Sequence, residues 1–273
     1  MTDVLSKDMI LTAILPHLPT AQRGKSCDNE LLFILIQLIL HRLKTGCQWR
    51  MLPIKEYTSK PYNWRTVYYH YNKWCKQGVW QAAWRELLKN NLEHLNLRTA
   101  QLDGTHTICK KGGQRVGYQK RKASNTSNML CISDENGIIL SASDPIEGNH
   151  HDSHKIGAHF ERLVAMLQAM GINVKGLILN ADAAFDCQEL RKVCNKYEIE
   201  ANFDLNPRNG SLVEREEYFD PEFYQSRSVI ERSFAWLDAY KALLIRYETS
   251  ERNWMNLNIL GFMTVFLKRV IKC

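Results

Sequence analysis

The sequence lacks the patterns that mark secreted, disulfide-stapled or membrane-spanning proteins. Its eight cysteines form no C-x-x-C pair, which favours free thiols in a reducing compartment over a disulfide or zinc framework. The first residues show no basic stretch followed by an apolar core, so we expect no secretory signal. The apolar run 31–40 is about half as long as a membrane span and indicates a buried helix instead. We therefore expect a cytoplasmic protein without a membrane partner.

Acidic residues are in the minority, and a nucleotide-binding loop of the form G-x-x-x-x-G-K-[ST] is missing. Lys and Arg total 36 against 29 Asp and Glu, so the net charge is +7. A basic excess of this kind favours nucleic acid or another anionic surface as the partner. The 273 residues are enough for two modest domains, each with its own core.

Residues 1–95 have the composition of an all-helical domain. The segment 64–74 has helical periodicity, with the basic residues Arg65 and Lys73 outside its apolar stripe. The first 96 residues carry 13 Lys and Arg against 7 Asp and Glu. Short helices, aromatic residues and a basic face suggest a helix-turn-helix module that binds DNA. A plain helical bundle with an aromatic core is the alternative.

From residue 96 onward the pattern changes to a mixed α/β order. Two of the expected strands form a hairpin around the turn Asp134-Glu135-Asn136-Gly137, and helices separate the later strands. The predicted strands are 99–108, 128–133, 138–143, 176–181 and 200–205, and the predicted helices are 153–170, 187–198, 226–247 and 252–271. We expect a second domain, residues 96–273, built as a mixed five-stranded sheet with flanking helices.

Three acidic residues stand in settings that suggest a metal site. Asp103 and Asp182 each end a run that is predicted to be a strand, and Glu231 lies inside a long helical pattern. If the hairpin lies on one side of the first strand, a right-handed crossover makes the strands of Asp103 and Asp182 neighbours at a switch point. Mg²⁺ prefers carboxylate oxygens, so the trio could hold two ions for phosphoryl transfer. Any one of these acids alone would be taken as a solvated surface residue.

Two further polar clusters each have two interpretations. The stretch 148–154 places His150 and His151 beside an Asp, which suggests a zinc site, but Asp152 or Ser153 is equally suited to cap the helix that follows. A basic stretch after the first strand, residues 110–115 and 119–122, includes six Lys and Arg residues and a glycine pair. It suits contacts with DNA phosphate, and a solvated hairpin is the alternative. Its expected DNA contacts are Lys110, Lys111 and Arg121.

These residues resemble the motifs of the DDE transposases of bacterial insertion sequences, families four and five, over nearly the whole chain. The first Asp motif is similar to Leu102-Asp103-Gly104-Thr105, the second to Asn180-Ala181-Asp182, and the third to Tyr224-x-x-Arg227-x-x-x-Glu231. The gaps of 78 and 48 residues between the three acids are compatible with this family. Residues 42–53 and 64–80 also resemble its N-terminal DNA-binding region.

The resemblance implies a ribonuclease-H-like catalytic domain and transposase activity. It implies that Asp103, Asp182 and Glu231 are catalytic and hold two Mg²⁺ ions, for which Mn²⁺ can substitute. Metal-activated water would cut the element ends, and the freed 3′-hydroxyl would attack target DNA. The expected partner is double-stranded DNA, at the terminal inverted repeats and the target, with a homodimer or higher assembly on DNA in a bacterial cytoplasm. Tyr224 and Arg227 are expected to contact this DNA.

The sequence departs from the family pattern at two places. Relatives often have a Lys seven positions after the Glu, whereas this chain has Asp238 there and Lys241 one turn later. We expect Lys241 to supply the missing DNA contact. An Ala-Ala pair replaces the commoner basic-Gly pair after Asp182. Asp186, four residues beyond Asp182, is expected to cap the next helix and not to bind metal.

Three other functions stay open at this point. They are a related nuclease without strand transfer, a transposase-derived DNA-binding regulator that no longer cuts, and an unrelated metal hydrolase that uses the His150 cluster. The intact acidic trio argues against the regulator, and the basic helical domain argues against the hydrolase. The sequence does not define the terminal repeats, the target preference, the cleavage pathway or the oligomeric state.

Overall fold

A computed structural model describes residues 4–19, 27–151, 153–210 and 218–271 of the chain. Two compact units divide the molecule, and the first is discontinuous. It comprises Met1–Leu87 together with Leu237–Cys273, whereas the second comprises Leu88–Trp236. The sequence placed the last segment with residues 96–273, so the compact units differ from the expected domains at the C-terminal end. No helix within the described ranges is both long and apolar enough to cross a membrane.

The first unit is helical apart from one two-residue strand. Its elements are α1 (Lys7–Ala13), α2 (Asn29–Thr45), α3 (Ile54–Tyr57), α4 (Trp64–Lys76), most of α5 (Val79–Lys89), α10 (Lys241–Leu244), β8 (Ile245–Arg246) and α11 (Glu251–Arg269). The carboxylate of Asp28 accepts a hydrogen bond from Leu31 N at 2.7 Å and begins α2. Gly46, with φ of 68°, ends α2 in the left-handed conformation that glycine adopts readily. The buried helix expected over the apolar run 31–40 is therefore part of α2.

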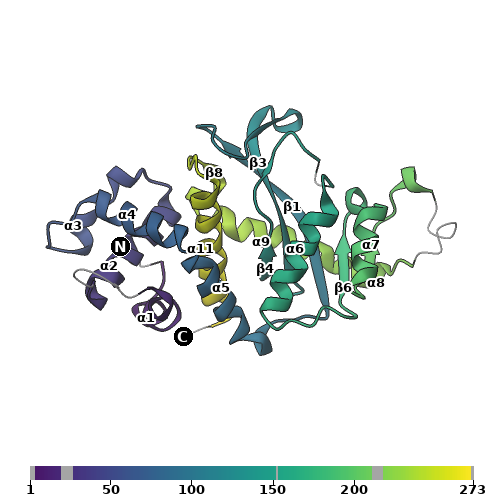
Figure 1. Cartoon of the computed structure of the whole chain (residues 1–273), viewed down its shortest axis with the longest axis horizontal. Helices are drawn as coiled ribbons and strands as arrows, with labels where there is room; N and C mark the ends of the chain where they lie inside the picture. The colour runs from purple at the N-terminus through teal and green to yellow at the C-terminus, as the bar shows by residue number, and fades with distance from the viewer. Residues whose placement is uncertain (1–3, 20–26, 152, 211–217, 272–273) are drawn as a thin grey trace. The chain divides into compact units, whose positions relative to one another are not determined.

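The C-terminal helix α11 packs against α2, α4 and α10 of the first unit. Nearly all of its residues from Asn253 to Leu267 are buried, so it has no solvent-facing stripe. The Tyr71 hydroxyl donates a hydrogen bond to the Asn253 carbonyl, and the Trp84 ring lies 5.8 Å from that of Phe266. Figure 1 shows α11 beside α5. The N-terminal helices therefore depend on the end of the chain for their core.

The predicted helix 226–247 is wrong as a single element. The chain forms α8 (Pro221–Tyr224), a 3₁₀ turn (Gln225–Ser228), α9 (Val229–Asp238), α10 and then β8. Between α9 and α10 Tyr240 takes an extended conformation, and its side chain is buried. Lys44 donates a hydrogen bond at 3.0 Å to the Ala239 carbonyl and places its ammonium over the Tyr240 ring. These tertiary contacts stabilise the break between α9 and α10, where the sequence has no Gly or Pro that would predict the end of a helix.

A mixed sheet forms the core of the second unit. Its main path runs β2 (Gly117–Gln119), β3 (Ser124–Asp134), β1 (Thr99–Cys109), β6 (Ile178–Ala181) and β7 (Glu200–Phe203), and the short strands β4 (Ile139–Ala142) and β5 (Ile146–Glu147) pair with β3. The β1–β3 pair is antiparallel, whereas β1–β6 and β6–β7 are parallel. All five predicted strands are present, and the strands that carry the first two acids are neighbours, as expected. The very short strands β2 and β5 were not predicted.

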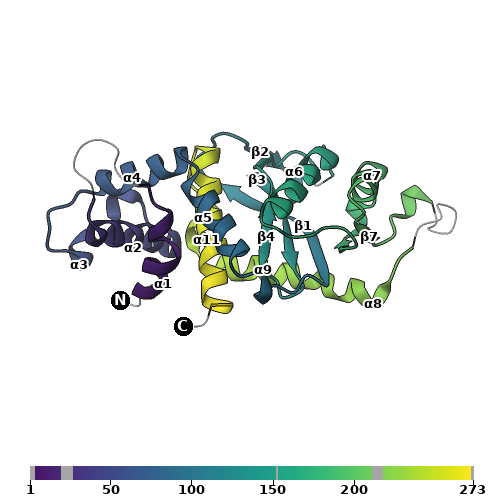
Figure 2. The ribbon, with the colours of Figure 1, turned by 60° about the horizontal axis from the view of Figure 1, so that its bottom comes forward.

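Helices cover both faces of this sheet. Figure 2 shows α6 (Ile156–Ala169) and α7 (Gln188–Lys196) on one face, and α8 and α9 on the other. The N-cap residue of α6 is Lys155, whose side chain makes no capping hydrogen bond. The expected cap at Ser153 is therefore wrong, and the alternative cap, Asp152, lies outside the described residues. The mixed α/β class and the helical N-terminal region are confirmed.

Candidate active site

Asp103 and Asp182 each stand one residue beyond the last pair of two adjacent parallel strands. The parallel pairing of β1 and β6 ends with Leu102 opposite Ala181, so the two aspartates occupy the next position on each chain. Asp103 still pairs with Cys131 of β3, whereas Asp182 begins the 3₁₀ turn that follows β6. Both side chains are partly exposed. The sheet therefore brings these two acids together as the sequence predicts.

Arg227 links Glu231 to this pair. Its guanidinium lies 3.3 Å from a Glu231 oxygen and 3.8 Å from an Asp103 oxygen. The Asp103 and Arg227 side chains are each about one-fifth exposed, whereas that of Glu231 is 62 % exposed. A cation thus lies between the first and the third acid. Tyr224, Arg227 and Glu231 lie on a segment made of α8, a 3₁₀ turn and α9, and not on one continuous α-helix.

Tyr224 lies among these charges. The Arg227 guanidinium is 5.9 Å from the centroid of the Tyr224 ring. Partial burial raises the pKa of Tyr224, and the negative charges of Asp204 and Asp182 raise that pKa further, whereas Arg227 opposes them. The Tyr224 hydroxyl is therefore a neutral hydrogen-bond group beside the acids. Asp204 was not among the predicted site residues, and it follows β7 at the position in register with Asp103 and Asp182.

The donor atoms at this end of the sheet are those that a hard divalent cation prefers. Asp103, Asp182 and Glu231 offer only carboxylate oxygens, and hard ions such as Mg²⁺ and Mn²⁺ bind oxygen ligands. In the parts of the chain that the structure describes, no three His, Cys, Asp or Glu side chains are close enough together to hold a metal ion as they stand. The oxygen donors of the site therefore fit a divalent ion. Because Arg227 lies between Glu231 and Asp103, the Glu231 side chain would have to approach the aspartates to bind the same ion.

Asp186 has a structural role. It is buried, and its carboxylate accepts hydrogen bonds from the Arg191 guanidinium at 2.9 Å and from Asn206 N at 3.1 Å. The expected helix cap is wrong, since α7 begins after Cys187 without a side-chain cap. The local sequence gave no sign of an ion pair within the first turns of this helix.

The His-rich stretch 148–154 contains a pair of stacked imidazole rings, and its described residues form no metal site. The rings of His150 and His154 are parallel at 3.8 Å, and His150 Nε2 lies 3.9 Å from a Glu147 oxygen. Desolvation lowers the pKa of His154, and the neighbouring charges of His150 and Lys155 lower it further. His151 is exposed. Asp152 lies outside the described residues.

The predicted DNA-contacting cations lie on several elements. Lys110, Lys111 and Arg121 are exposed beyond the far end of β1, which continues past Asp103 as a ribbon with β3. In the first unit, Arg65 is exposed in the first turn of α4, and Lys73 is half-buried in its last turns. Lys241 is exposed at the start of α10, where its backbone lies against Gly46.

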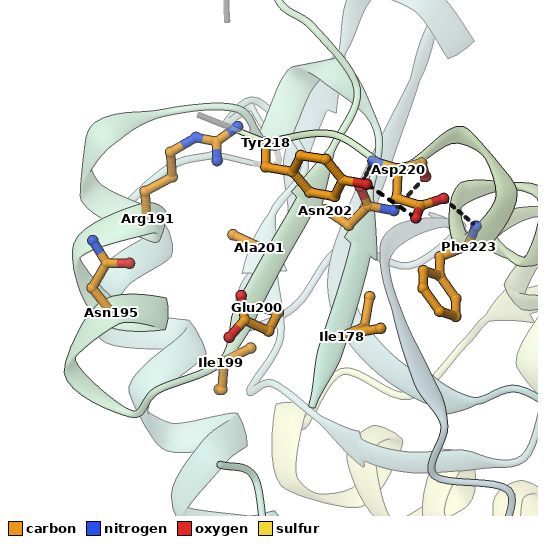
Figure 3. A pocket seen from close by; sticks show the side chains of 10 residues that line it. All are labelled: Ile178, Arg191, Asn195, Ile199, Glu200, Ala201, Asn202, Tyr218, Asp220 and Phe223. Atoms are coloured by element: carbon orange, nitrogen blue, oxygen red, sulfur yellow. Dashed lines mark hydrogen bonds between the residues drawn. The ribbon is translucent and has the colours of Figure 1, made fainter. Parts of the chain in front are cut away.

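A buried amide network below the acids was missed by sequence reasoning. Gln101, Asn180 and Asn202 occupy one register position across β1, β6 and β7, and each is at most 5 % exposed. The available signal was a polar residue inside the apolar run Leu179-Asn180-Ala181. Next to the network is a cavity of about 560 Å³, which Figure 3 shows between α7, β7 and the Tyr218–Phe223 region. None of the three candidate acids lines this cavity.

Two family models match the chain. Residues 102–262 match the model described as "DDE superfamily endonuclease", and residues 8–84 match the model described as "Putative transposase of IS4/5 family". The first match spans more than half of the sequence and includes all three acids. The chain therefore belongs to the DDE superfamily endonucleases, and it is a transposase of the IS4/5 type.

Solved structures of Mos1 transposase are among those similar to the chain. Its catalytic domain is 10 % identical, with a TM-score of 0.31, and the match covers 67 % of this chain and 87 % of that one. Its paired-end complex with the left transposon end is 11 % identical, with a TM-score of 0.29, and the match covers 90 % and 80 % of the two chains. Among curated proteins, no sequence matches the chain.

Proposed function

We propose that the protein binds the ends of an insertion sequence, cuts the DNA there and joins the freed 3′-hydroxyl ends to target DNA. One observation carries this proposal: two in-register aspartates at the end of the parallel strands face a helical segment whose Arg227 connects Asp103 to Glu231. Three carboxylates from three elements are what a phosphoryl-transfer site with divalent ions requires. Double-stranded DNA supplies the scissile phosphate.

Asp103, Asp182 and Glu231 would hold the divalent ions, two Mg²⁺ with Mn²⁺ as a substitute. When bound, such ions activate the attacking oxygen and stabilise the leaving oxygen of a phosphodiester. Arg227 would keep the free acids from repelling one another before the ions bind and would then be available to a DNA phosphate. The neutral Tyr224 hydroxyl would donate a hydrogen bond to the same strand.

The other cations would hold the DNA outside the cleavage site. Lys110 lies seven residues beyond Asp103 along β1, roughly 23 Å at the rise of a strand. Lys110, Lys111 and Arg121 would therefore contact phosphates roughly seven base pairs from the scissile bond. Arg65 and Lys73 of α4 would bind a separate stretch of the element end. We expect two or more copies to assemble on DNA in the bacterial cytoplasm, since two ends must be joined.

The acids provide the direct test. Asp103→Asn, Asp182→Asn and Glu231→Gln keep the shape of each side chain but remove the charge that attracts a divalent ion. We expect each variant to lose Mg²⁺-dependent cleavage of a duplex that carries the element end, while binding of that duplex in EDTA stays within about twofold of the parent. Near-normal cleavage by a variant would remove that residue from the site. Cleavage without joining to a target duplex would identify a nuclease that lacks strand transfer.

A further inference from the structure

The amides of Gln101, Asn180 and Asn202 form a single directed chain of hydrogen bonds across three strands. Asn202 Nδ2 donates to Asn180 Oδ1 at 2.8 Å, and Asn180 Nδ2 donates to Gln101 Oε1 at 3.0 Å. The Asp220 N–H, which can only donate, bonds to Asn202 Oδ1 at 2.7 Å. This backbone donor sets the orientation of Asn202, and each amide then fixes the next one. We call these three residues the amide ladder.

The amide ladder lies on the same face of the sheet as the acids. Side chains two residues apart on a strand point to the same face, so Gln101 lies below Asp103, and Asn180 lies below Asp182. The separation along each strand is roughly 7 Å. The ladder is therefore the layer of side chains that supports the row of aspartates.

The ladder also holds the segment that carries Tyr224, Arg227 and Glu231. Asn180 Nδ2 reaches the Phe223 carbonyl at 2.9 Å and Ser226 Oγ at 3.1 Å, and Gln101 Nε2 reaches Ser226 Oγ at 3.3 Å. Ser226 Oγ in turn donates to the Phe223 carbonyl at 2.8 Å. Ser226 and Phe223 each precede a residue of the candidate site, Arg227 and Tyr224. A shift of Ser226 therefore moves Arg227 directly.

The third strand connects to the start of the same segment. Asn202 Nδ2 donates to the Asp220 carbonyl at 2.9 Å, and Asp220 Oδ1 accepts from the backbone N–H groups of Glu222 and Phe223. Figure 3 shows Asn202 and Asp220 joined in this way beside the cavity. Three strands and the segment 220–226 are thus joined through one buried polar network in which every amide has a partner.

We propose that Asn180 and Ser226 are positioning residues, which fix the distance between the aspartates on the strands and the segment that carries Arg227 and Glu231. This inference rests on the proposed cleavage activity. A phosphoryl-transfer site tolerates little displacement of its groups, because an error of about 1 Å can reduce the rate by roughly a hundredfold. A polar network gives a defined register here, where apolar packing would allow the segment to slide.

Ser226 offers the cleanest variant. Ser226→Ala removes the hydroxyl but leaves Asn180 bonded to Gln101 and Phe223, and leaves Gln101 bonded to Thr99 at 2.8 Å, so the protein should fold. Ser226→Thr retains the hydroxyl. We expect Ser226→Ala to reduce the single-turnover cleavage rate at saturating protein by roughly tenfold or more, with DNA affinity in EDTA unchanged, and Ser226→Thr to keep the rate within about threefold. Hydrogen exchange at Glu222 and Phe223 should be faster in Ser226→Ala.

A second pair separates positioning from stability. Asn180→Ala removes the donor to Gln101 Oε1 and one of the two acceptors of Asn202 Nδ2, which keeps the Asp220 carbonyl. Leu179→Ala instead opens a cavity at the buried neighbouring position of the same strand, on the opposite face. At temperatures chosen so that both variants are equally folded, Asn180→Ala should cleave at least tenfold more slowly than Leu179→Ala. Equal rates for this pair, or for Ser226→Ala and Ser226→Thr, would overturn the positioning role. A parent protein that does not cleave would instead overturn the proposed function.

Discussion

Two aspartates only four residues apart have opposite environments. Asp182 is partly exposed, and one of its oxygens accepts a hydrogen bond from Ala184 N at 2.9 Å. Asp186 is fully buried and binds Arg191, whose side chain is 11 % exposed. An aspartate that holds a buried cation contributes to stability, whereas one that faces solvent in a row of acids is available for ligands.

This contrast predicts opposite effects of the same substitution. Asp186→Asn should lower the free energy of unfolding by about 3 kcal/mol, because it leaves the Arg191 charge uncompensated. Asp182→Asn should change stability by less than about 1 kcal/mol, since the amide oxygen can still accept from Ala184, but it should abolish cleavage. Urea denaturation of the two variants, with cleavage assays in parallel, tests both statements. A larger stability loss for Asp182→Asn would reverse the assignment of the two residues.

The Arg227 guanidinium contacts Asp103, Glu231 and the Tyr224 ring within the site. Arg227→Ala should slow cleavage and strand transfer by roughly ten- to a hundredfold, because both the link to Asp103 and Glu231 and a phosphate contact are lost. Arg227→Lys keeps the positive charge but loses the planar guanidinium that contacts two carboxylates, so its cleavage and strand-transfer rates should lie between those of the parent and Arg227→Ala. Strand-transfer rates at one salt concentration provide the measurement.

Two exposed residues further along the chain complete this comparison. Lys241→Ala should also weaken strand transfer if Lys241 replaces the missing family Lys, whereas Asp238→Lys should be neutral or mildly activating. Parental activity in Lys241→Ala would show that Lys241 is no substitute. Loss of activity in Asp238→Lys would assign Asp238 a role that its exposed position at the end of α9 does not suggest.

The sequence alone predicted the candidate acids one by one, but it did not predict the buried amides and the ion pairs around them. The two aspartates follow strands with clear apolar patterns, and parallel pairing then brings them together. Asn180 gives only a weak signal, because a single buried amide is indistinguishable from an exposed one until its partners on other strands are known. The Arg227 link to Asp103 likewise depends on a contact between residues far apart in the sequence.

At the level of single elements, the end of α2 provides a sensitive test of the packing around α10. A Cβ on Gly46 would lie 3.1 Å from Lys241 Cβ and 3.2 Å from its backbone carbon, and the φ of Gly46 is +68°. Gly78 has the same φ, but a Cβ there would lie 4.0 Å from the nearest atom, on Gln81. The two glycines share the backbone cost and differ in the close approach.

Gly78→Ala should therefore lower the free energy of unfolding by about 1 kcal/mol, the cost of a left-handed alanine. Gly46→Ala should lower it by about 2 kcal/mol or more, since α10 must also move away from α2. Thermal or urea unfolding of both variants measures the difference. If both variants lost the same free energy of unfolding, α10 would move away from a Cβ at position 46 without an energetic penalty.

The elements that the sequence predicted incorrectly are those decided by distant contacts. The apolar pattern of residues 226–247 is continuous, and nothing local marks the break at Tyr240, which depends on Lys44. The sequence likewise predicts α11 as a packed helix, but a helix that is buried on all sides does not reveal its neighbours.

For the whole molecule, the first unit is formed by two separate parts of the chain, so a fragment that contains only the N-terminal part lacks residues of its core. Residues 1–95 without α11 would expose Trp84 and leave the Tyr71 hydroxyl without its acceptor on Asn253. We expect this fragment to be largely unfolded, with weak circular dichroism and no cooperative melting. A fusion of residues 1–87 to residues 237–273 through a flexible linker should fold and bind the element end with strong salt dependence. A fragment 1–95 that melts cooperatively would contradict this expectation.

The discontinuity also orders events during synthesis of the protein. Residues 88–236 leave the ribosome before residues 237–273, so the sheet with its row of acids can form while the helical unit still lacks its last helix. A nascent chain at this stage, or one cut short by a premature stop, contains the candidate nuclease site but not the complete unit that we propose binds element ends. If the helical unit binds element ends as we propose, this binding is the last property that the growing chain acquires, and premature termination removes it first.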